Sequence, residues 1–205
     1  TAIEERRAAV IRGKVVTRDG APLPDVTVTI LGHPELGQTR TRSDGMFDLA
    51  VNGGGPLTAN YATRGYLTVQ RPLDVPWQDF VVAPDVVMTP IDSRASTITA
   101  GAATLQLHRG TTVSDDDGSR TSVLLFPAGT TAQMVLPGGS IQPLASFAVR
   151  ATEYTVGPQG PEAMPAPLPT NSAYTYAVDL SVDEAIAAGA IRVEFSQPVV
   201  NYVEN

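Results

Sequence analysis

Residues 24–51 constrain the fold more than any other stretch, because they alternate like β-strands and contain no helical period. Within them, residues 26–30 alternate Val and Ile with Thr, which is the period-two pattern of a half-buried strand. Residues 39–42 alternate again, and residues 46–51 carry Phe, Leu and Val on one face. The Ser-Asp-Gly sequence at residues 43–45 joins these two segments as a tight turn, because Gly accepts positive φ and Asp bonds its own backbone. The stretch therefore predicts three strands of a small β-sandwich.

The rest of the first half continues as short strands separated by turn residues. We predict strands at residues 8–18, 26–30, 39–42, 46–51, 57–62, 66–70 and 79–83. Residues 72–78 are expected to cross back between the last two strands, and Phe80 and Val82 share one face of the last strand. This number of short strands is about what a small sandwich needs. The first domain is therefore expected to cover residues 1–90, with Pro84 and Pro90 bracketing the connection that follows.

The second half, residues 91–205, is predicted to form a second β-rich domain with one short helix. We expect its strands at residues 96–100, 104–114, 120–126, 131–136, 141–144, 147–156, 174–180 and 191–195. Ser181 is expected to cap the helix, Asp183 and Glu184 favour its first turn through the helix dipole, and Gly189 ends it. The whole chain is therefore predicted to be all-β.

A Pro-rich segment interrupts this second domain at residues 157–172. Its five prolines exclude a regular strand or helix. A loop of this length inside a compact domain is typically functional or ordered by a partner. Met164 and Leu168 are its only large apolar residues, and in a free loop both side chains would stay exposed to water. We therefore expect them to pack on the second domain, with the other face of the segment presented to the rest of a larger protein.

Composition excludes several classes of protein. The net charge of −7 and the pI near 4.7 argue against binding a phosphate backbone, which needs clustered Lys and Arg. The absence of Cys excludes thiolate zinc sites and cysteine nucleophiles. No apolar run approaches the roughly 18 residues that a membrane span needs, and residues 1–9 lack the apolar core of a signal peptide. The abrupt start and end are typical of a piece of a longer protein.

Few residues could carry catalytic or metal chemistry. His33 and Glu35 give H-x-E, and one His with one Glu cannot complete a three-ligand zinc site. His108 is expected in a strand, facing solvent or hydrogen-bonded. Residues 115–117 are three consecutive Asp before Gly118, but an EF-hand frame places Val and Leu at ligand positions, so we expect a solvated hairpin tip. We therefore predict no catalytic residue, no cofactor and no required metal.

The order of short phrases in the first half resembles the transthyretin-like, carboxypeptidase-regulatory family. The phrases are the G-x-V sequence at 13–15, the P-L-P-x-V-x-V sequence at 22–28 and the T-x-S-D-G-x-F-x-L sequence at 41–49. The resemblance implies a transthyretin-like or immunoglobulin-like β-sandwich for residues 1–90. It is a resemblance to the accessory domain of the zinc carboxypeptidases, which carries no catalytic residues.

Longer phrases in the second half resemble the region ahead of the repeats in bacterial Rhs/YD-repeat proteins, which are relatives of the animal teneurins. These phrases lie at residues 122–130, 149–158, 174–178, 183–185, 195–199 and 202–205. The resemblance implies a β-rich plug domain after the transthyretin-like domain. It also implies a non-catalytic structural segment of a large secreted or cell-surface protein. Its partner would be the YD-repeat shell of its own parent chain, which the segment caps or plugs.

Two alternatives stay open beside this interpretation. The first is a surface adhesin or carbohydrate-binding sandwich, for which Trp77 could stack on a sugar if Tyr61 or Tyr66 were exposed beside it. A Trp in such a place is more often a plug under the sandwich rim, with its N–H bonded to a carbonyl. The second alternative follows a resemblance in fold to B-type repeats of collagen adhesins, in which Lys14 would crosslink to Asn60 beside a buried Asp48.

Overall fold

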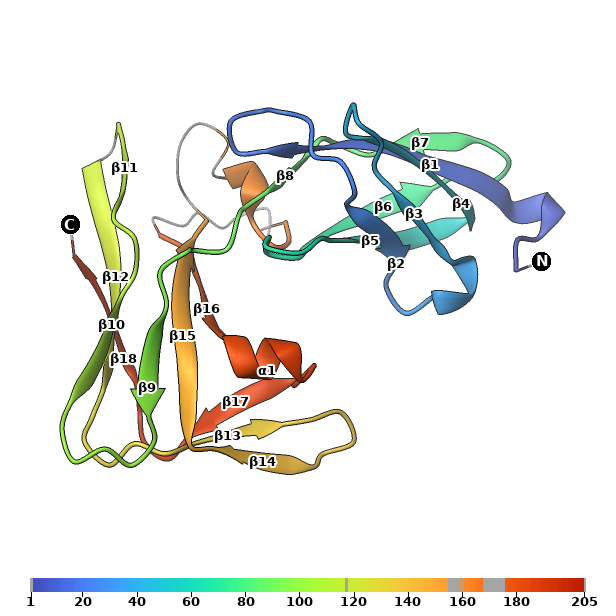
Figure 1. The fold of residues 1–205 in the computed structure, drawn as a ribbon. Coiled ribbons are helices and arrows are strands. Elements are labelled where there is room, and N and C mark those ends of the chain that lie inside the picture. The colour runs from blue at the N-terminus through green and yellow to red at the C-terminus, as the bar shows by residue number, and fades with distance from the viewer. Residues whose placement is uncertain (1, 117, 155–158, 160, 168–175, 205) are drawn as a thin grey trace. The chain divides into compact units, whose positions relative to one another are not determined.

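The computed structural model describes residues 2–116, 118–154, 159, 161–167 and 176–204 (Figure 1). The chain divides into two compact units. The first contains Thr1–Pro90 and Pro158–Thr175, and the second contains Ile91–Gly157 and Tyr176–Asn205. The Pro-rich segment therefore belongs largely with the first unit, where the sequence analysis expected it with the second.

The first unit is a sandwich of two sheets. Its first sheet has the order β4 (Met46–Asn52), β1 (Ala8–Thr17) and β7 (Phe80–Val82), and β8 (Val86–Met88) also pairs with β1. Its second sheet has the order β3 (Gln38–Arg40), β2 (Thr27–Ile30), β5 (Gly55–Ala62) and β6 (Val69–Val75). Three short 3-10 helices also belong to this unit: η1 (Glu5–Arg7) precedes β1, η2 (Pro34–Leu36) lies between β2 and β3, and η3 (Pro161–Ala163) lies in the Pro-rich segment. β4 runs antiparallel to β1, whereas β7 and β8 run parallel to it.

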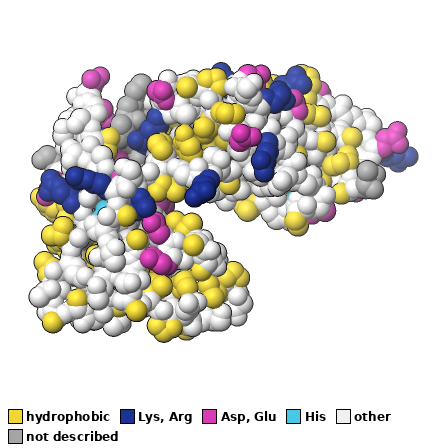
Figure 2. Space-filling view, viewed as in Figure 1, with side chains coloured by type: hydrophobic (Ala, Val, Ile, Leu, Met, Phe, Trp, Pro, Cys, Tyr) yellow, Lys and Arg dark blue, Asp and Glu magenta, His cyan; other side chains and the backbone are white. Residues whose placement is uncertain are grey.

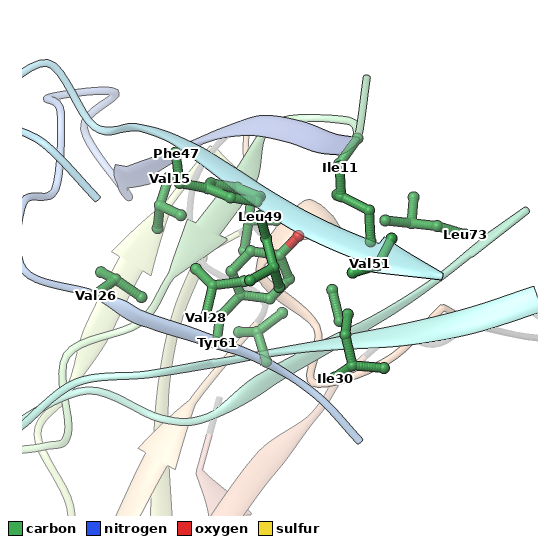
Figure 3. Close-up of a cluster of buried hydrophobic side chains, with 14 of the residues drawn as sticks. Ile11, Val15, Val26, Val28, Ile30, Phe47, Leu49, Val51, Tyr61 and Leu73 are labelled. Carbon is green, nitrogen blue, oxygen red and sulfur yellow. The ribbon is translucent and has the colours of Figure 1, made fainter. Parts of the chain in front are cut away.

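The core of the first unit lies between the inward faces of these two sheets (Figure 3). Phe47 and Tyr61 are fully buried and meet edge to face, with ring centroids 5.6 Å apart. Around them lie Ile11, Val15, Val26, Val28, Ile30, Leu49, Val51 and Leu73. Most of these residues are the alternating apolar positions of residues 24–51, so that stretch supplies much of the core.

Three details of the first unit differ from the sequence prediction. β8 was not predicted, and β6 begins at Val69 and continues to Val75 instead of crossing back after residue 70. β6 contains Pro72, which is tolerated because β6 is an edge strand and needs no outward amide at that position. Phe80 and Val82 do share a face, but that face is turned to solvent.

The second unit contains three small sheets within its described residues. The first has β10 (Gln106–Arg109), β12 (Gly118–Phe126) and β11 (Val113–Asp115), with β18 (Val200–Glu204) also paired to β12. The second has β14 (Ile141–Leu144), β13 (Ala132–Val135) and β17 (Arg192–Phe195). The third has β16 (Val178–Val182), β15 (Ser146–Glu153) and β9 (Ser96–Thr99). The helix α1 (Asp183–Ala187) follows β16.

An aromatic cluster forms the centre of the second unit's core. The rings of Phe126 and Phe147 lie 5.9 Å apart, and each lies 5.8 Å from the ring of Phe195. Ile98, Leu124, Met134, Leu144, Val149 and Val182 pack around this cluster. The predicted β-rich second half is therefore borne out at the level of fold class.

Two local predictions in the second unit were wrong. Ser181 lies in β16, and the residue before the helix is Val182, which makes no side-chain cap bond. β18 was not predicted, because residues 200–204 carry no turn signal and gain their strand conformation by pairing with β12. Gly189 does follow the helix with a left-handed φ of 63°, as a terminating glycine should.

Candidate functional site

The two histidines lie in different units and form no common site. His33 is exposed, and its Nδ1 lies 2.9 Å from Oε1 of Glu35. His108 is fully buried, with Nδ1 3.0 Å from Oγ of Ser96. Burial lowers the pKa of His108, which favours the neutral imidazole. Among the described residues, no group of three or more His, Cys, Asp or Glu side chains is arranged to hold a metal ion.

The carboxylate of Asp115 is not solvated, contrary to the expectation for the hairpin tip. The turn between β11 and β12 is the predicted hairpin, but Asp115 accepts two hydrogen bonds from Arg120, at 3.0 and 2.5 Å. Arg120 also donates from Nε to Oε1 of Glu153 at 3.0 Å. These two carboxylates hold the pKa of Arg120 above its usual value, after a smaller opposing effect of burial. Asp115 is therefore part of a structural ion-pair network that ties the hairpin to β15.

The Lys14–Asn60 crosslink is excluded by the strand faces. Lys14 and Asp48 lie on the outward face of the first sheet, where Asp48 accepts hydrogen bonds from Arg12 and Arg42. Asn60 lies on the outward face of the second sheet and accepts a hydrogen bond from Gln70. The core of the sandwich separates the two faces, so the amine and the amide cannot meet.

Trp77 is exposed, so it does not plug the sandwich. Its side chain is 63% accessible, and Phe80, three residues later, is 59% accessible. Gln78 between them has a left-handed φ of 51°, which is uncommon for a residue with a side chain. Tyr61, one of the two expected companions of Trp77 in a sugar platform, is buried.

A groove of about 520 Å³ lies beside Phe80 on the first unit. It crosses three strands: Val10 of β1 pairs with Ala50 of β4 on one side and with Phe80 of β7 on the other, and all three residues line it. Its other lining residues are Glu5, Ala8, Ala9, Gln78 and Asp79. The groove thus combines an exposed aromatic ring with amide and carboxylate groups, and no Lys or Arg is among its lining residues.

The described part of the Pro-rich segment contacts β6 of the first unit. The backbone amide of Gln70 donates to the carbonyl of Pro165 at 2.8 Å, and Arg71 donates to the carbonyl of Met164 at 3.0 Å. Met164 is half-buried, and Leu168 lies outside the described residues. The expectation that Met164 packs on the second domain is therefore not what the structure has. A docked segment needs backbone partners, and the free edge of β6 supplies them.

The outward face of the sheet β10–β12–β18 carries an apolar stripe. Leu107, Leu125 and Val200 are cross-strand neighbours, and Leu107 and Val200 are 54% and 51% accessible. Tyr202 lies on the same face, opposite Val123, and is 57% accessible. An ion pair between Arg109 and Glu204 borders the stripe. Sequence reasoning missed this stripe, because β18 was not predicted and the outward neighbours on three strands could not be aligned.

Comparison with known proteins assigns the first unit to a class. Residues 3–88 match the family model described as the teneurin TTR-like domain. The described strands of the first unit form the β-sandwich expected of a transthyretin-like domain. Residues 3–88 are therefore similar to the teneurin TTR-like domain, in sequence and in the kind of fold.

Individual teneurins are also similar in sequence to part of this chain. Teneurin-3 of Mus musculus is 47% identical over 81 residues, teneurin-1 of Gallus gallus is 43% identical over 90, and teneurin-m of Drosophila melanogaster is 41% identical over 95. These matches cover 40%, 44% and 46% of this chain, and 3% of each relative. The chain thus corresponds to a small part of the length of the curated relatives it matches.

The solved structures that were compared are only weakly similar to this chain. A DUF3823 family protein from Bacteroides ovatus aligns with 96% of this chain and 91% of its own, at 10% identity and a TM-score of 0.30. Among the described residues, the structure has no helix that is both long and apolar enough to cross a membrane.

Proposed function

We propose that this chain is a non-catalytic structural segment of a large YD-repeat protein, in which the second unit caps or plugs the repeat shell of its own parent chain. The teneurin-type domain at residues 3–88 supports the class of parent protein. The Rhs/YD-repeat phrases of the second half support the plug role and an extracellular or cell-surface location. The parent's shell would then be the principal partner.

The apolar stripe on β10, β12 and β18 is the observation that carries the capping role. Monomeric domains rarely leave large apolar side chains together on one sheet face, and such patches mark interaction surfaces. Leu107, Val200 and Tyr202 are each more than half accessible on that face, next to the half-buried Leu125. Figure 2 shows hydrophobic side chains at the surface over this sheet, at the left edge of the view. Covering them with the shell would remove this apolar area from water.

Hydrogen exchange in the full-length parent protein tests this proposal. The expected result is slower exchange of the amides in β10 and β18 in the parent than in the 205-residue chain, because docking excludes water from the face. The double variant Leu107→Glu with Val200→Glu should abolish that protection and leave the folding of the isolated chain nearly unchanged. Ile186→Glu is the matched control, since Ile186 is 58% accessible on α1 of the same unit. Equal exchange in the parent and the isolated chain would refute the capping role.

A second candidate function, binding of a neutral carbohydrate, is favoured by the groove beside Phe80. Exposed aromatic faces offer sugars a stacking surface, and the carboxylates and amide of Glu5, Gln78 and Asp79 can bond hydroxyl groups. The absence of a cationic lining residue disfavours anionic ligands. Trp77 would extend the surface, because three residues of chain separate its Cα from that of Phe80 by at most about 11 Å.

A panel of neutral oligosaccharides tests this second candidate. Binding by the wild-type chain should weaken at least about tenfold in Trp77→Ala and in Phe80→Ala, as expected for the loss of one stacked ring. Leu31→Ala, at another exposed apolar position of the first unit, should bind as wild type. If no neutral sugar is retained at millimolar concentration, the groove has no carbohydrate function. Retention of Lys- or Arg-rich peptides instead would point to a cationic ligand.

A further inference from the structure

The contacts that hold residues 162–165 on the first unit are made mainly by the backbone of the segment. Gln70 donates its amide to the carbonyl of Pro165 at 2.8 Å. The guanidinium of Arg71 donates to the carbonyl of Met164 at 3.0 Å and to that of Glu162 at 2.6 Å. It also donates to the carbonyl of Gln70 at 2.7 Å. β6 therefore presents one edge amide and one forked donor to the main-chain carbonyls of a segment that includes the 3-10 helix η3 (Pro161–Ala163).

Ala163 occupies an apolar socket beside these hydrogen bonds. It is completely buried, and it packs in one cluster with Val16 and Val87, which are 5% and 1% accessible. Val16 and Val87 are direct neighbours on the parallel strands β1 and β8. Val15 and Val86, the residues before them, point instead into the core of the sandwich. Both sides of these two strands are therefore covered, one by the core and the other by Ala163.

Arg71 binds main-chain carbonyls of the segment and does not simply extend into solvent. Burial lowers its pKa, and no carboxylate is paired with it in the described part of the chain. Its planar fork suits several acceptors at once. Here the acceptors are main-chain carbonyls, two of which belong to the docked segment. Without the segment, this half-buried guanidinium would lose two of its acceptors, so its hydrogen bonding favours the occupied site.

We propose that the edge of β6, Arg71 and the Val16–Val87 pair form a peptide-binding site on the TTR-like domain, and that residues 162–165 fill it in this chain. The ligand class is a short segment that forms a tight turn, with a small residue at its centre and a proline nearby. Its main-chain carbonyls accept hydrogen bonds from the edge amide of Gln70 and from Arg71, and the one apolar pocket gives specificity. This site is independent of the capping face on the second unit.

The sequence of the segment fits this binding mode. Ala163 is small enough for the socket, whereas a larger side chain would clash with Val16 or Val87. Pro165 accepts the bond from Gln70 through its carbonyl and has no amide to leave unpaired on the outer side. Prolines also lower the entropy cost of ordering the segment. Any chain with these features could occupy the site when the internal segment is absent.

Binding in trans tests the proposal. Residues 160–169 are replaced by a Gly/Ser linker of equal length, and a synthetic peptide of residues 159–169, blocked at both ends, is titrated by calorimetry. Saturable binding is expected, and an Ala163→Glu peptide should bind at least about tenfold more weakly because it forces a charge into the apolar socket. An Ala166→Glu peptide should bind as the unaltered one, since Ala166 is exposed. Arg71→Ala in the linker protein should abolish binding.

No saturable binding, or equal affinity of the Ala163→Glu and Ala166→Glu peptides, would overturn the proposal. If the linker protein does not fold, limited proteolysis of the intact chain decides instead. Ala163→Glu should then speed cleavage within residues 159–167 at least several-fold, while Ala166→Glu should not. Equal cleavage of these two intact variants would overturn the proposal as firmly. Either failure would leave the capping role of the second unit untouched.

Discussion

At the scale of single residues, Trp77 shows how a neighbouring backbone position can set the place of a side chain. Gly54 has a φ of 101°, and a Cβ built on it would lie 1.4 Å from Nε1 of Trp77. The indole therefore rests directly on the backbone of Gly54. A residue with a side chain would have to adopt an unfavourable φ and displace the ring as well.

Gly54→Ala should accordingly destabilise the first unit by about 1–3 kcal/mol, the range for a strained backbone conformation. The measurement is the urea midpoint followed by far-UV circular dichroism. Gly55→Ala is the control, because no atom lies within 4 Å of its Cβ position, and its effect should stay within about 0.5 kcal/mol. Equal midpoints for the two variants would mean that the ring moves aside at no cost.

His108 makes the stability of the second unit depend on pH. Its Nδ1 is bonded to Ser96, and its Nε2 is buried without a partner among the described residues. Burial lowers its pKa below the ordinary 6.5, with a smaller effect from Arg150 and Arg94 that the carboxylate of Asp92 opposes. The unfolded state therefore binds a proton at a higher pH than the folded state does.

The stability contribution of neutral His108 should be fully present above about pH 7 and decline as the pH falls below about 6.5. Urea midpoints of the second unit at pH 7.5 and 5.5 measure this decline. His108→Gln should reduce the difference between the two midpoints. His33→Gln, on the exposed turn of the first unit, should leave it as in the wild type. A wild-type midpoint that does not fall between these pH values would contradict the expectation.

At the scale of elements, Arg120 fastens the β11–β12 hairpin to β15. Its side chain is 12% accessible, and its partners Asp115 and Glu153 are 14% and 4% accessible. A buried ion pair adds little net stability as a whole, but removing one partner leaves the other charge buried and uncompensated. The sequence showed the hairpin turn but gave no sign that one carboxylate in it belongs to a buried network.

Arg120→Met should destabilise the second unit by about 3–5 kcal/mol, because it removes the cation that faces the two mostly buried carboxylates of Asp115 and Glu153. Arg109→Met is the matched control, since the Arg109–Glu204 pair is exposed and worth less than about 1 kcal/mol. Chemical denaturation of both variants measures the two losses of unfolding free energy. A loss of less than about 1 kcal/mol in Arg120→Met would mean that Glu153 is compensated by other groups.

At the scale of the whole molecule, the two units have separate hydrophobic cores. Phe47 is central in the first core and Phe147 in the second, and no residue is shared between the two clusters. The division of the chain into two domains, with residues 1–90 in the first, can therefore be tested by unfolding. Trp77 is the only tryptophan in the sequence and lies in the first unit, so its fluorescence reports that unit alone.

Phe47→Ala should lower the unfolding free energy seen by Trp77 fluorescence by about 3–5 kcal/mol, the usual cost of removing a buried Phe side chain. Phe147→Ala should leave that transition in place and shift only the remaining change in far-UV circular dichroism. If each variant shifts both signals equally, the chain unfolds as one cooperative body and the two-domain division fails.

The sequence by itself determined the features that depend on near neighbours in the chain. Alternation of Val, Ile and Thr specified β2, and the Ser-Asp-Gly turn set the start of β4, because period and turn chemistry are local. The phrases of residues 13–49 also pointed to the transthyretin-like fold that the family match supports. The local pattern placed His108 in a strand but left open whether it faces solvent or is hydrogen-bonded, and the structure has it buried and bonded to Ser96.

Only the tertiary structure decided which face of each strand is covered and by what. Alternation marks two faces but does not say what lies against them, so Phe80 and Val82 could be predicted to share a face and still prove exposed. The paired Val doublets at residues 15–16 and 86–87 were the one available signal that both faces of β1 and β8 are buried. Arg71 and Met164 meet across 93 residues of sequence, and no local pattern encodes such a contact. The free edge of β6 and the socket beside it exist only once the sandwich has folded.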